Sequence, residues 1–237
     1  MQKRLDVYLS ENNTVKSRSL AASLIKQGSV EVNGRICTKA SFAVDENDNI
    51  RIIGEMPKYV GRGGMKLEKA LSHYRLHLDG SVCIDIGAST GGFTDCMLQN
   101  GAVKVYSVDV GTDQLDEKLR NDPRVVSMEK TDIRNCVGSL PAVDFIGIDV
   151  SFISLKLVLP SAYALLKNGG ECVALIKPQF EAGKSHLSKH GIVRDSKVHK
   201  KVCDDISEFA STLGFERGEV ISSPITGGDG NTEYLIY

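Results

Sequence analysis

Charged side chains end, or closely follow, several apolar runs in the second part of the sequence. They are Asp85, Asp109, Asp132, Asp149 and Lys177. If these runs are parallel strands, the charged side chains meet at one edge of a sheet, which is where open α/β sheets bind their ligands. The first three carboxylates suit a cofactor, whereas Asp149 and Lys177 suit the group with which that cofactor reacts. A single buried aspartate beside a lysine could also be purely structural.

A glycine-rich turn lies in the same part of the chain, within residues 82–94, VCIDIGASTGGFT. The pattern predicts a buried strand that ends in a tight turn and leads into a helix. Glycine is needed where the backbone turns sharply or lies against a ligand, and the free N–H groups at a helix start favour polar or anionic ligand atoms. We therefore expect this turn to form the floor of a pocket for a nucleotide-like molecule. Its candidate binding residues are Gly87, Ala88, Ser89, Gly91, Gly92 and Phe93.

The spacing of these glycines bears on which nucleotide the pocket takes. The dinucleotide fingerprint is G-x-G-x-x-G, whereas here Gly87 is followed by Gly91 and Gly92. The missing second glycine disfavours a dinucleotide, because the pyrophosphate needs the backbone to approach closely. Asp109, about twenty residues further on, suits a pair of ribose hydroxyl groups. The pattern resembles the S-adenosylmethionine turn of Rossmann-like methyltransferases, and an ordinary strand-to-helix turn is the alternative.

Length and composition limit the classes of protein to which the chain can belong. Its 237 residues suffice for a large and a small domain, and 41% hydrophobic with 25% charged residues is ordinary for a soluble globular protein. The formal net charge of −1 excludes a polycation, so RNA contacts must come from local patches. The six cysteines form no C-x-x-C pair and have no histidine at metal spacing, which predicts reduced thiols and no metal site. Because there is neither an N-terminal signal nor a long apolar run, we expect a cytoplasmic protein without membrane contacts. The oligomeric state stays open.

The first 56 residues have the pattern of a small basic module. Helices are expected around residues 5–9 and 17–28, a hairpin around Asn33-Gly34, and a strand at residues 49–53. The motifs R-L-D-x-x-L, S-R-S-x-A and I-x-x-G-x-V-x-V-N-G resemble the S4 RNA-binding domain. This resemblance implies a face that binds structured RNA through phosphates, whereas charge alone favours a solvated helix face. The residues of this face are Arg4, Lys16, Ser17, Arg18 and Lys26.

Residues 57–64 are rich in glycine and predict a linker, which leaves residues 65–237 as a second domain. Lys66 stands just inside the start of its first expected helix, either exposed or aimed into a cleft. Strands and helices then alternate, which predicts a doubly wound sheet. The last two strands are joined by a loop too short for a crossover helix and should form an antiparallel pair at one edge. The fold class is therefore α/β, Rossmann-like with a mainly parallel seven-stranded sheet, preceded by the small α+β module.

Longer motifs resemble one family along nearly the whole chain. They are G-R-G-G-x-K-L, D-I-G-A-S-T-G-G-F-T-D, V-D-V-G-x-x-Q-L, D-V-S-F-I-S-L, L-I-K-P-Q-F-E, G-I-V-R-D and S-P-I-x-G-x-x-G-N-x-E-Y-L. The chain resembles the TlyA-type proteins, often labelled haemolysin A, of the FtsJ-like ribosomal RNA methyltransferases. The resemblance implies 2′-O-methylation of ribose, with S-adenosylmethionine as cofactor and ribosomal RNA or a ribosomal subunit as partner. It also implies a catalytic Lys-Asp-Lys-Glu tetrad, which falls on Lys66, Asp149, Lys177 and Glu233.

The chemistry of ribose methylation suits these residue types. A ribose hydroxyl is a poor nucleophile at neutral pH and must be aligned with the methyl donor. We expect Lys177 to hold the hydroxyl and to stabilise its oxygen as negative charge develops, or to accept its proton. Asp149 and Glu233 would then orient Lys177 and Lys66.

Other functions stay open at this point. The chain could be an inactive methyltransferase that serves as an RNA-binding or ribosome-assembly protein, or it could methylate a small molecule. A membrane-active haemolysin is disfavoured, because the sequence has no strongly basic amphipathic helix. A loop over residues 181–195 is either a lid that clamps RNA or a mobile solvated loop. Its basic residues are Lys184, His186, Lys189, His190 and Arg194.

Overall fold

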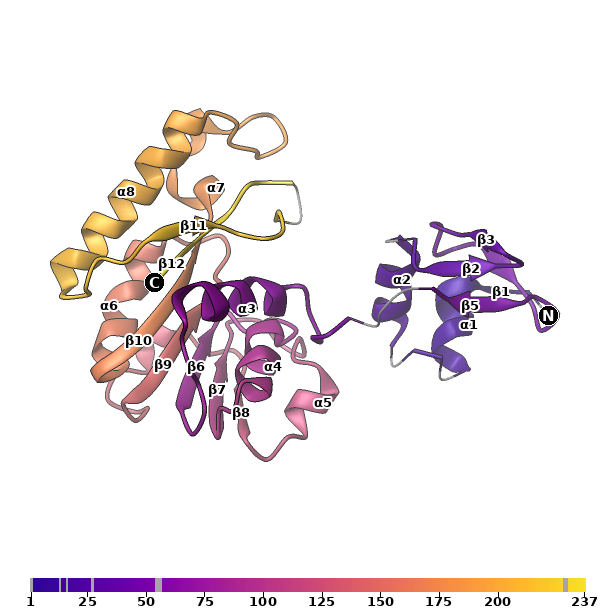
Figure 1. Ribbon diagram of the computed structural model, residues 1–237, viewed down its shortest axis with the longest axis horizontal. Coiled ribbons are helices and arrows are strands. Elements are labelled where there is room, and N and C mark those ends of the chain that lie inside the picture. Colours follow the sequence, from indigo (N-terminus) through magenta and orange to yellow (C-terminus); the bar gives the residue numbers. More distant parts are fainter. Residues whose placement is uncertain (1, 13, 16, 27, 54–56, 228–229) are drawn as a thin grey trace. The chain divides into compact units, whose positions relative to one another are not determined.

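The computed structural model describes residues 2–12, 14–15, 17–26, 28–53, 57–227 and 230–237. The chain forms two compact units, Met1–Met56 and Pro57–Tyr237, whose elements are labelled in Figure 1. Each unit buries apolar side chains of its own, so each can be described by itself.

The described part of the first unit contains two short helices and two small sheets. Its helices are α1 (Leu5–Glu11) and α2 (Arg18–Lys26), and its strands are β1 (Lys3–Arg4), β2 (Val30–Val32), β3 (Arg35–Ile36), β4 (Ala43–Val44) and β5 (Ile50–Ile52). Strands β3, β2 and β5 form an antiparallel sheet in that order, and β1 pairs with β4. The expected order of helix, helix, hairpin and strand is confirmed. The β1–β4 pair escapes prediction, because strands of two residues show no hydrophobic alternation.

Apolar spacing and turn chemistry explain this small unit. Leu5 and Leu9 lie one turn apart on α1 and belong to the same buried cluster as Leu24 of α2. Asn33 and Gly34 join β2 to β3 with positive φ angles of 53° and 77°, as a two-residue hairpin turn requires. The helices and the hairpin therefore form around one core.

The second unit is a seven-stranded sheet with helices on both faces. Its strands are β6 (Val82–Ile86), β7 (Lys104–Val108), β8 (Val125–Met128), β9 (Val143–Ile148), β10 (Leu166–Ile176), β11 (Val220–Ser222) and β12 (Tyr234–Ile236). Its helices are α3 (Gly63–Tyr74), α4 (Gly92–Gln99), α5 (Glu117–Arg120), α6 (Leu155–Leu165), α7 (Pro178–Glu181) and α8 (Ser196–Leu213), with 3-10 turns η1 (Ile133–Asn135) and η2 (Lys184–His186). The strand order is β11-β12-β10-β9-β6-β7-β8, and only the pairs made by β12 are antiparallel. The predicted mainly parallel sheet with an antiparallel edge pair is confirmed.

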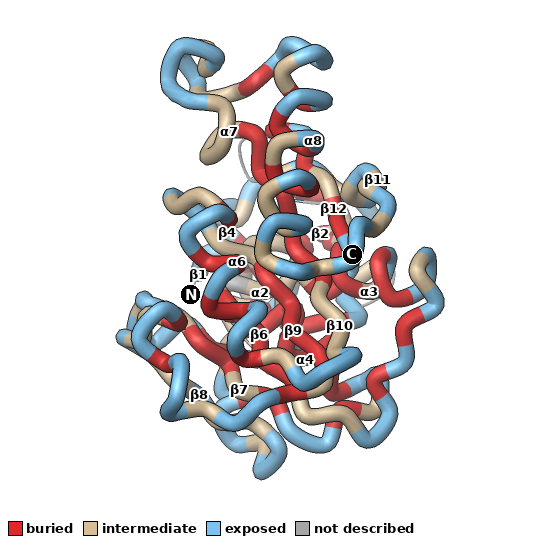
Figure 2. Tube along the Cα trace, turned by 90° about the vertical axis from the view of Figure 1, so that its left-hand side faces the viewer, coloured by how far each residue is buried: buried red, intermediate tan, exposed pale blue. Residues whose placement is uncertain are grey.

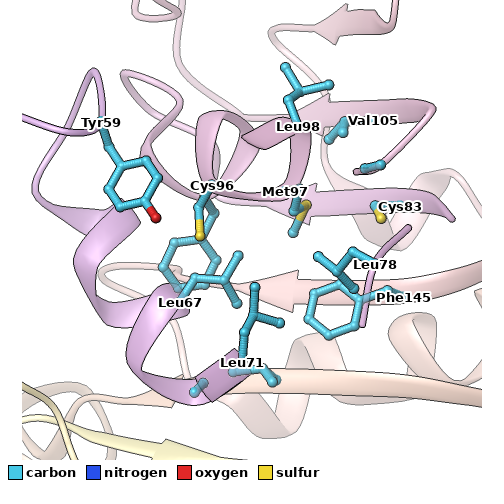
Figure 3. Close-up of a cluster of buried hydrophobic side chains, with 14 of the residues drawn as sticks. Tyr59, Leu67, Leu71, Leu78, Cys83, Cys96, Met97, Leu98, Val105 and Phe145 are labelled. Atoms are coloured by element: carbon cyan, nitrogen blue, oxygen red, sulfur yellow. The ribbon is translucent and has the colours of Figure 1, made fainter. Parts of the chain in front are cut away.

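The central strands are apolar on both faces because helices cover both. Cys83 and Phe145 face the core beneath α3 and α4, where Figure 3 shows them with Leu67 and Met97. Ile84, the next residue along β6, belongs instead to the core beneath α6 and α8. Figure 2 shows β6 and β9 as a buried centre. This sandwich fixes the carboxyl ends of the strands, which carry the predicted site residues.

Strand β12 runs antiparallel to its neighbours, and this brings Glu233, the residue before it, to the carboxyl edge of the parallel strands. Parallel strands present their carboxyl ends at that edge, whereas an antiparallel strand presents its amino end there. Ile176 of β10 pairs with Tyr234 of β12. Lys177 and Glu233 are the next residues outward on the two strands, so their backbones adjoin at the ligand-binding edge.

Residues 57–64, predicted to be a linker, are part of the second unit. Tyr59 is buried in the core beneath α3, and its ring leaves no room for a side chain at Gly64. The backbone N–H of Val60 donates a 2.9 Å hydrogen bond to the carboxylate of Asp95 on α4. Glycine and proline indicate irregular backbone in this segment, but irregular backbone can still pack against a core.

Candidate active site

The four charged residues predicted to form a tetrad meet at the carboxyl edge of the sheet. Lys66 comes from the first turn of α3, Asp149 follows β9, Lys177 follows β10 and Glu233 precedes β12. The Lys66 ammonium donates a 2.7 Å hydrogen bond to Glu233 Oε2 and lies 3.5 Å from Asp149 Oδ2. The Lys177 ammonium lies 2.6 Å from Asp149 Oδ1. Asp149 therefore bridges the two lysines, and the order of contacts is Glu233, Lys66, Asp149, Lys177.

Burial makes this arrangement costly unless its charges cancel. Lys66 and Lys177 are each 8% exposed, and Glu233 is 3% exposed. Two ammonium groups and two carboxylates give a set with no net charge. Each member has an opposite charge within 3.5 Å. Charges at this depth in a cleft, held by partners from four separate elements, are typical of an active site.

Two adjoining cavities meet at Lys177. The first, of about 200 Å³, is lined by the glycine-rich turn, Phe93 and Asp149. The second, of about 280 Å³, is lined by Lys66 and Glu233 together with aromatic and polar residues of the following segments. Gly63, Ser151 and Lys177 line both. A molecule in one cavity therefore comes within reach of a molecule in the other at the Lys177 ammonium.

The glycine-rich turn has the geometry that its sequence predicts. Gly87 and Gly91 have positive φ angles of 86° and 94°, which residues with a Cβ rarely adopt. A Cβ at Gly87 would lie 2.5 Å from the carbonyl oxygen of Asp149, and one at Gly92 would lie 2.8 Å from the amide nitrogen of Gly64. Of the predicted turn residues, Gly87, Ala88, Ser89, Gly92 and Phe93 line the first cavity. Gly91 lines neither cavity and instead packs against Leu119 of α5 and Leu115 just before that helix.

Asp85 lies beneath this turn rather than in a cavity lining. It is fully buried, and its Oδ2 accepts hydrogen bonds of 2.9 Å and 2.6 Å from the backbone N–H and hydroxyl of Thr94. Its Oδ1 has no hydrogen-bond partner. Burial raises the pKa of Asp85 to about 7. The carboxyl group therefore anchors the start of α4 to β6.

The other two aspartates expected at the cofactor also have internal partners. Asp109 accepts 2.7 Å hydrogen bonds from the backbone N–H groups of Ser89 and Gly111. Asp132 caps the turn η1 and pairs with Arg134 at 2.6 Å, which lowers the pKa of the carboxyl group. Neither residue lines the two cavities described here. A position at the end of a strand thus predicts the correct edge of the sheet but not which atoms a carboxylate will bind.

Residues that the sequence did not single out complete the second cavity. Ser151 accepts a 2.8 Å hydrogen bond from the Lys177 ammonium. Phe152 is 90% exposed at the cavity, although its φ angle of +64° is unusual for a bulky residue. Its ring centroid lies 5.0 Å from that of Phe180. The motif D-V-S-F carried this signal, because it places a hydroxyl and an aromatic ring two and three residues after Asp149.

Two of the basic residues predicted to form the RNA-binding face make ion pairs with one buried carboxylate, that of Asp6. The guanidinium groups of Arg4 and Arg18 both lie 2.9 Å from Asp6, which holds the pKa of that carboxyl group well below its usual range. Both arginine side chains remain about half exposed, at 49% and 58%. Ser17 accepts a hydrogen bond from the backbone at the start of α2, and Lys26 is exposed. Lys16, also predicted to bind RNA, lies outside the described residues.

The described ranges show neither a metal-binding cluster nor a helix suited to cross a membrane. There, no group of three or more histidine, cysteine, aspartate or glutamate side chains is arranged to hold a metal ion. None of the helices in those ranges combines the length and the apolar character that a membrane crossing needs.

Comparison with known proteins places this site in a family. The FtsJ-like methyltransferase model matches residues 59–237, and the S4 domain model matches residues 3–50. The provisionally assigned rRNA methyltransferase YqxC of Bacillus subtilis is 46% identical, and the alignment covers 100% of this chain and 85% of the relative. The 16S/23S rRNA (cytidine-2′-O)-methyltransferase TlyA of Mycobacterium tuberculosis is 37% identical, with 99% and 88% covered. The solved structure of a provisionally named hemolysin from Streptococcus thermophilus is 45% identical, has a TM-score of 0.79 and covers 99% of this chain and 87% of its own.

The family match spans the whole sheet and all four residues of the charged tetrad. The S4 match spans both helices and the hairpin of the first unit. The chain therefore belongs to the FtsJ-like methyltransferases and carries an S4 domain in residues 3–50.

Proposed function

We propose that this protein methylates the 2′-hydroxyl of a ribose in ribosomal RNA. The observation that carries the proposal is the position of Lys177, which stands in a charge-neutral tetrad where the two cavities meet. The TlyA relative named above is an rRNA cytidine-2′-O-methyltransferase, and the S4 domain suits an RNA substrate. A ribosomal substrate in turn favours a cytoplasmic location.

The first cavity fits S-adenosylmethionine, the methyl donor of this family. A Cβ at Gly87 or Gly92 would collide with neighbouring backbone, so glycine at these two positions lets the turn pack closely and form a cradle that lines the cavity. The amino end of α4 opens directly from this cradle and favours a polar or negatively charged ligand group. When bound, the cofactor supplies an electrophilic methyl group on a sulfonium. The remaining chemistry falls to the side chains of this chain.

Lys177 is placed to act on the attacking hydroxyl. An ammonium group has three N–H donors; Ser151 accepts a hydrogen bond from Lys177, and Asp149 lies 2.6 Å from the ammonium as its ion-pair partner. One donor is left for an oxygen in the adjoining cavities. A hydroxyl held there is oriented for attack, its oxygen is stabilised as it becomes negative, and its proton passes to solvent water in the open cavity. Lys66, paired with Glu233 and Asp149, keeps the shared carboxylate in place and balances its charge.

The second cavity has the composition expected of a nucleotide site. Its lining combines the aromatic rings of Phe152 and Phe180 with the charged groups of Arg62 and Lys66. A base stacks well on an exposed aromatic ring, and its phosphates pair with cations. The 90% exposure of Phe152 is explained if its ring serves as a stacking surface rather than as part of the core.

The proposal is tested by mapping 2′-O-methylation on ribosomal RNA from cells with and without the gene. The purified protein is then incubated with S-adenosylmethionine carrying a labelled methyl group and with each undermethylated ribosomal subunit. We expect a ribose methyl group that depends on the gene and is restored by wild-type protein. The variant Lys177→Met is assayed in the same way, with Lys156→Met, at an exposed lysine on α6, as its matched control. The control should restore the ribose methyl group as wild-type protein does.

Two results would replace the proposal. RNA binding without methyl incorporation into either subunit would indicate an RNA-binding or ribosome-assembly protein. Leakage of dye from liposomes treated with the purified protein would favour the membrane-active function suggested by the hemolysin name of a relative.

A further inference from the structure

The segment that carries Glu233 is held by buried polar side chains that take no direct part in the tetrad. Asn231, only 2% exposed, forms hydrogen bonds to the backbone of the basic loop at residues 181–195, on either side of Ile192. Its side-chain oxygen accepts a 3.2 Å hydrogen bond from the N–H of Val193, and its amide donates a 3.1 Å hydrogen bond to the carbonyl of Gly191. A buried asparagine that satisfies both ends of its amide in this way fixes the two segments relative to each other.

His199 on α8 makes a second connection between the same segments. It is 8% exposed, and its Nε2 lies 2.9 Å from the carbonyl oxygen of Val193. Because a carbonyl only accepts, Nε2 carries a proton and donates it to Val193, while Nδ1 forms a 2.8 Å hydrogen bond with the Tyr234 hydroxyl. Val193 is thus bound through its N–H by Asn231 and through its carbonyl by His199.

These contacts fall on both sides of Glu233. Asn231 is two residues before it and Tyr234 is the next residue after it. The backbone carbonyl of Glu233 accepts a 2.9 Å hydrogen bond from Ser223, beside β11. A Cβ at Gly227 would lie 2.6 Å from Glu233 Oε1, so the carboxylate has little room to move on that side. The position of Glu233 therefore depends on the backbone that Asn231 and His199 hold.

We propose that Asn231 and His199 are positioning residues that hold Glu233 against Lys66 by clamping residues 191–193 to the start of β12. The inference rests on the role of the tetrad in the proposed function. It also assigns a role to two motifs, G-I-V-R-D and G-N-x-E-Y-L. Of the residues in these motifs, only Glu233 belongs to the tetrad. On this proposal residues 191–193 are held in place by Asn231 and His199 rather than free to close as a lid.

The kinetic test compares Asn231→Ala, His199→Leu and Tyr234→Phe with wild type, with Asn121→Ala at the exposed end of α5 as control. We expect kcat to fall about 10- to 100-fold in the first two variants, since misplacement near 1 Å can cost that much. KM for the ribosomal subunit and the Kd for S-adenosylmethionine should stay within about twofold, because neither residue lines the cavities. His199→Gln offers a donor and an acceptor at similar reach and should recover most of the lost activity.

A double-mutant cycle separates positioning from a general structural role. If Asn231 acts through Glu233, Asn231→Ala should lower kcat much less in a Glu233→Gln background than in wild type. Equal losses in the two backgrounds, or wild-type kcat in both Asn231→Ala and His199→Leu, would overturn the inference. An inactive wild-type protein would instead refute the proposed function.

Hydrogen exchange gives a readout that does not depend on activity. We expect amide exchange at residues 230–236 and 191–193 to accelerate in Asn231→Ala while the central strands β6 and β9 stay protected. Unchanged exchange in these segments would overturn the inference whether or not the protein methylates RNA. Acceleration across the whole sheet would also overturn it, because the effect would then be global destabilisation.

Discussion

Replacing Lys177 with methionine separates the charge of this side chain from its volume. Methionine keeps an unbranched stem of similar length, so the packing beside Phe180 is largely retained. The substitution removes the N–H donors that reach Asp149 and Ser151, together with the donor that faces the cavities. Any loss of methyl transfer then reports the ammonium group rather than a collapse of the site.

The expected loss can be estimated from the contacts of Lys177. Removing one preorganised donor from an oxygen that becomes negative typically lowers kcat by about 100- to 1,000-fold, or about 2.7–4 kcal/mol. The Asp149 carboxylate keeps Lys66 at 3.5 Å and has a side-chain exposure of 17%, so it is not left buried and unpaired. We therefore expect a loss of stability of only about 1–3 kcal/mol, which a domain of ordinary stability tolerates.

The assay measures single-turnover methyl transfer to the undermethylated ribosomal subunit, with cofactor and enzyme in excess. Calorimetry gives the Kd for S-adenosylmethionine, which we expect to change less than about threefold, because the glycine cradle remains intact. Urea unfolding confirms that the variant is folded under the assay conditions. Methyl transfer within about tenfold of wild type, by a folded variant that still binds RNA, would refute the assignment of Lys177.

Three further predictions concern other charged residues of the structure. Burial raises the pKa of Asp85 to about 7 from its ordinary 3.8, so the folded state retains a proton that the unfolded state releases between about pH 4 and 7. The associated stability is lost as the pH rises through this window, and Asp85→Asn should gain free energy of unfolding relative to wild type from pH 4 to 7 in urea titrations. Arg18→Gln leaves one arginine on Asp6 and should weaken binding to ribosomal RNA, with the slope of log K against log salt smaller by about 0.7–0.9 in magnitude; an unchanged slope would remove this residue from the RNA interface. Lys66→Met leaves the buried Glu233 without its closest cation and should lower the free energy of unfolding by about 3–5 kcal/mol, of which an added Glu233→Gln should recover about half in the same unfolding experiment.

The sequence is a good guide to this fold because its strongest signals are local. Apolar runs that alternate along the chain with amphipathic helical segments predict the strands and helices of the sheet domain. Glycines at 87 and 91 indicate a turn that requires positive φ angles. The antiparallel pair at the edge follows from the length of one loop. Each of these features depends on neighbouring residues, which is the range over which a single sequence is informative.

The details of the site depend on contacts between distant segments, and there the sequence is a weaker guide. Asp85 and Asp109 stand at strand ends and Asp132 follows β8 by four residues, yet their carboxylates bind backbone or side-chain donors close by. Nothing in the local pattern separates a carboxylate that caps a helix from one that faces a ligand. Tyr59 is a similar case, because the glycines around it indicate a loop, while the core that buries it comes from α3 and α4.

The reversal of β12 explains why four charges so far apart in the sequence can form one site. A seventh strand parallel to the others would present residue 233 at the opposite edge of the sheet, about the length of a strand away from Lys177. The reversal also makes the site sensitive to register, because a shift of one residue along β10 would turn Glu233 to the other face of the sheet. Four hydrogen bonds oppose such a shift: the one from Ser223 to the Glu233 carbonyl, the two made by Asn231, and the one between Tyr234 and His199. The short strand β12 gives the site its fourth charge, and the polar clamp beside it gives that charge a defined position.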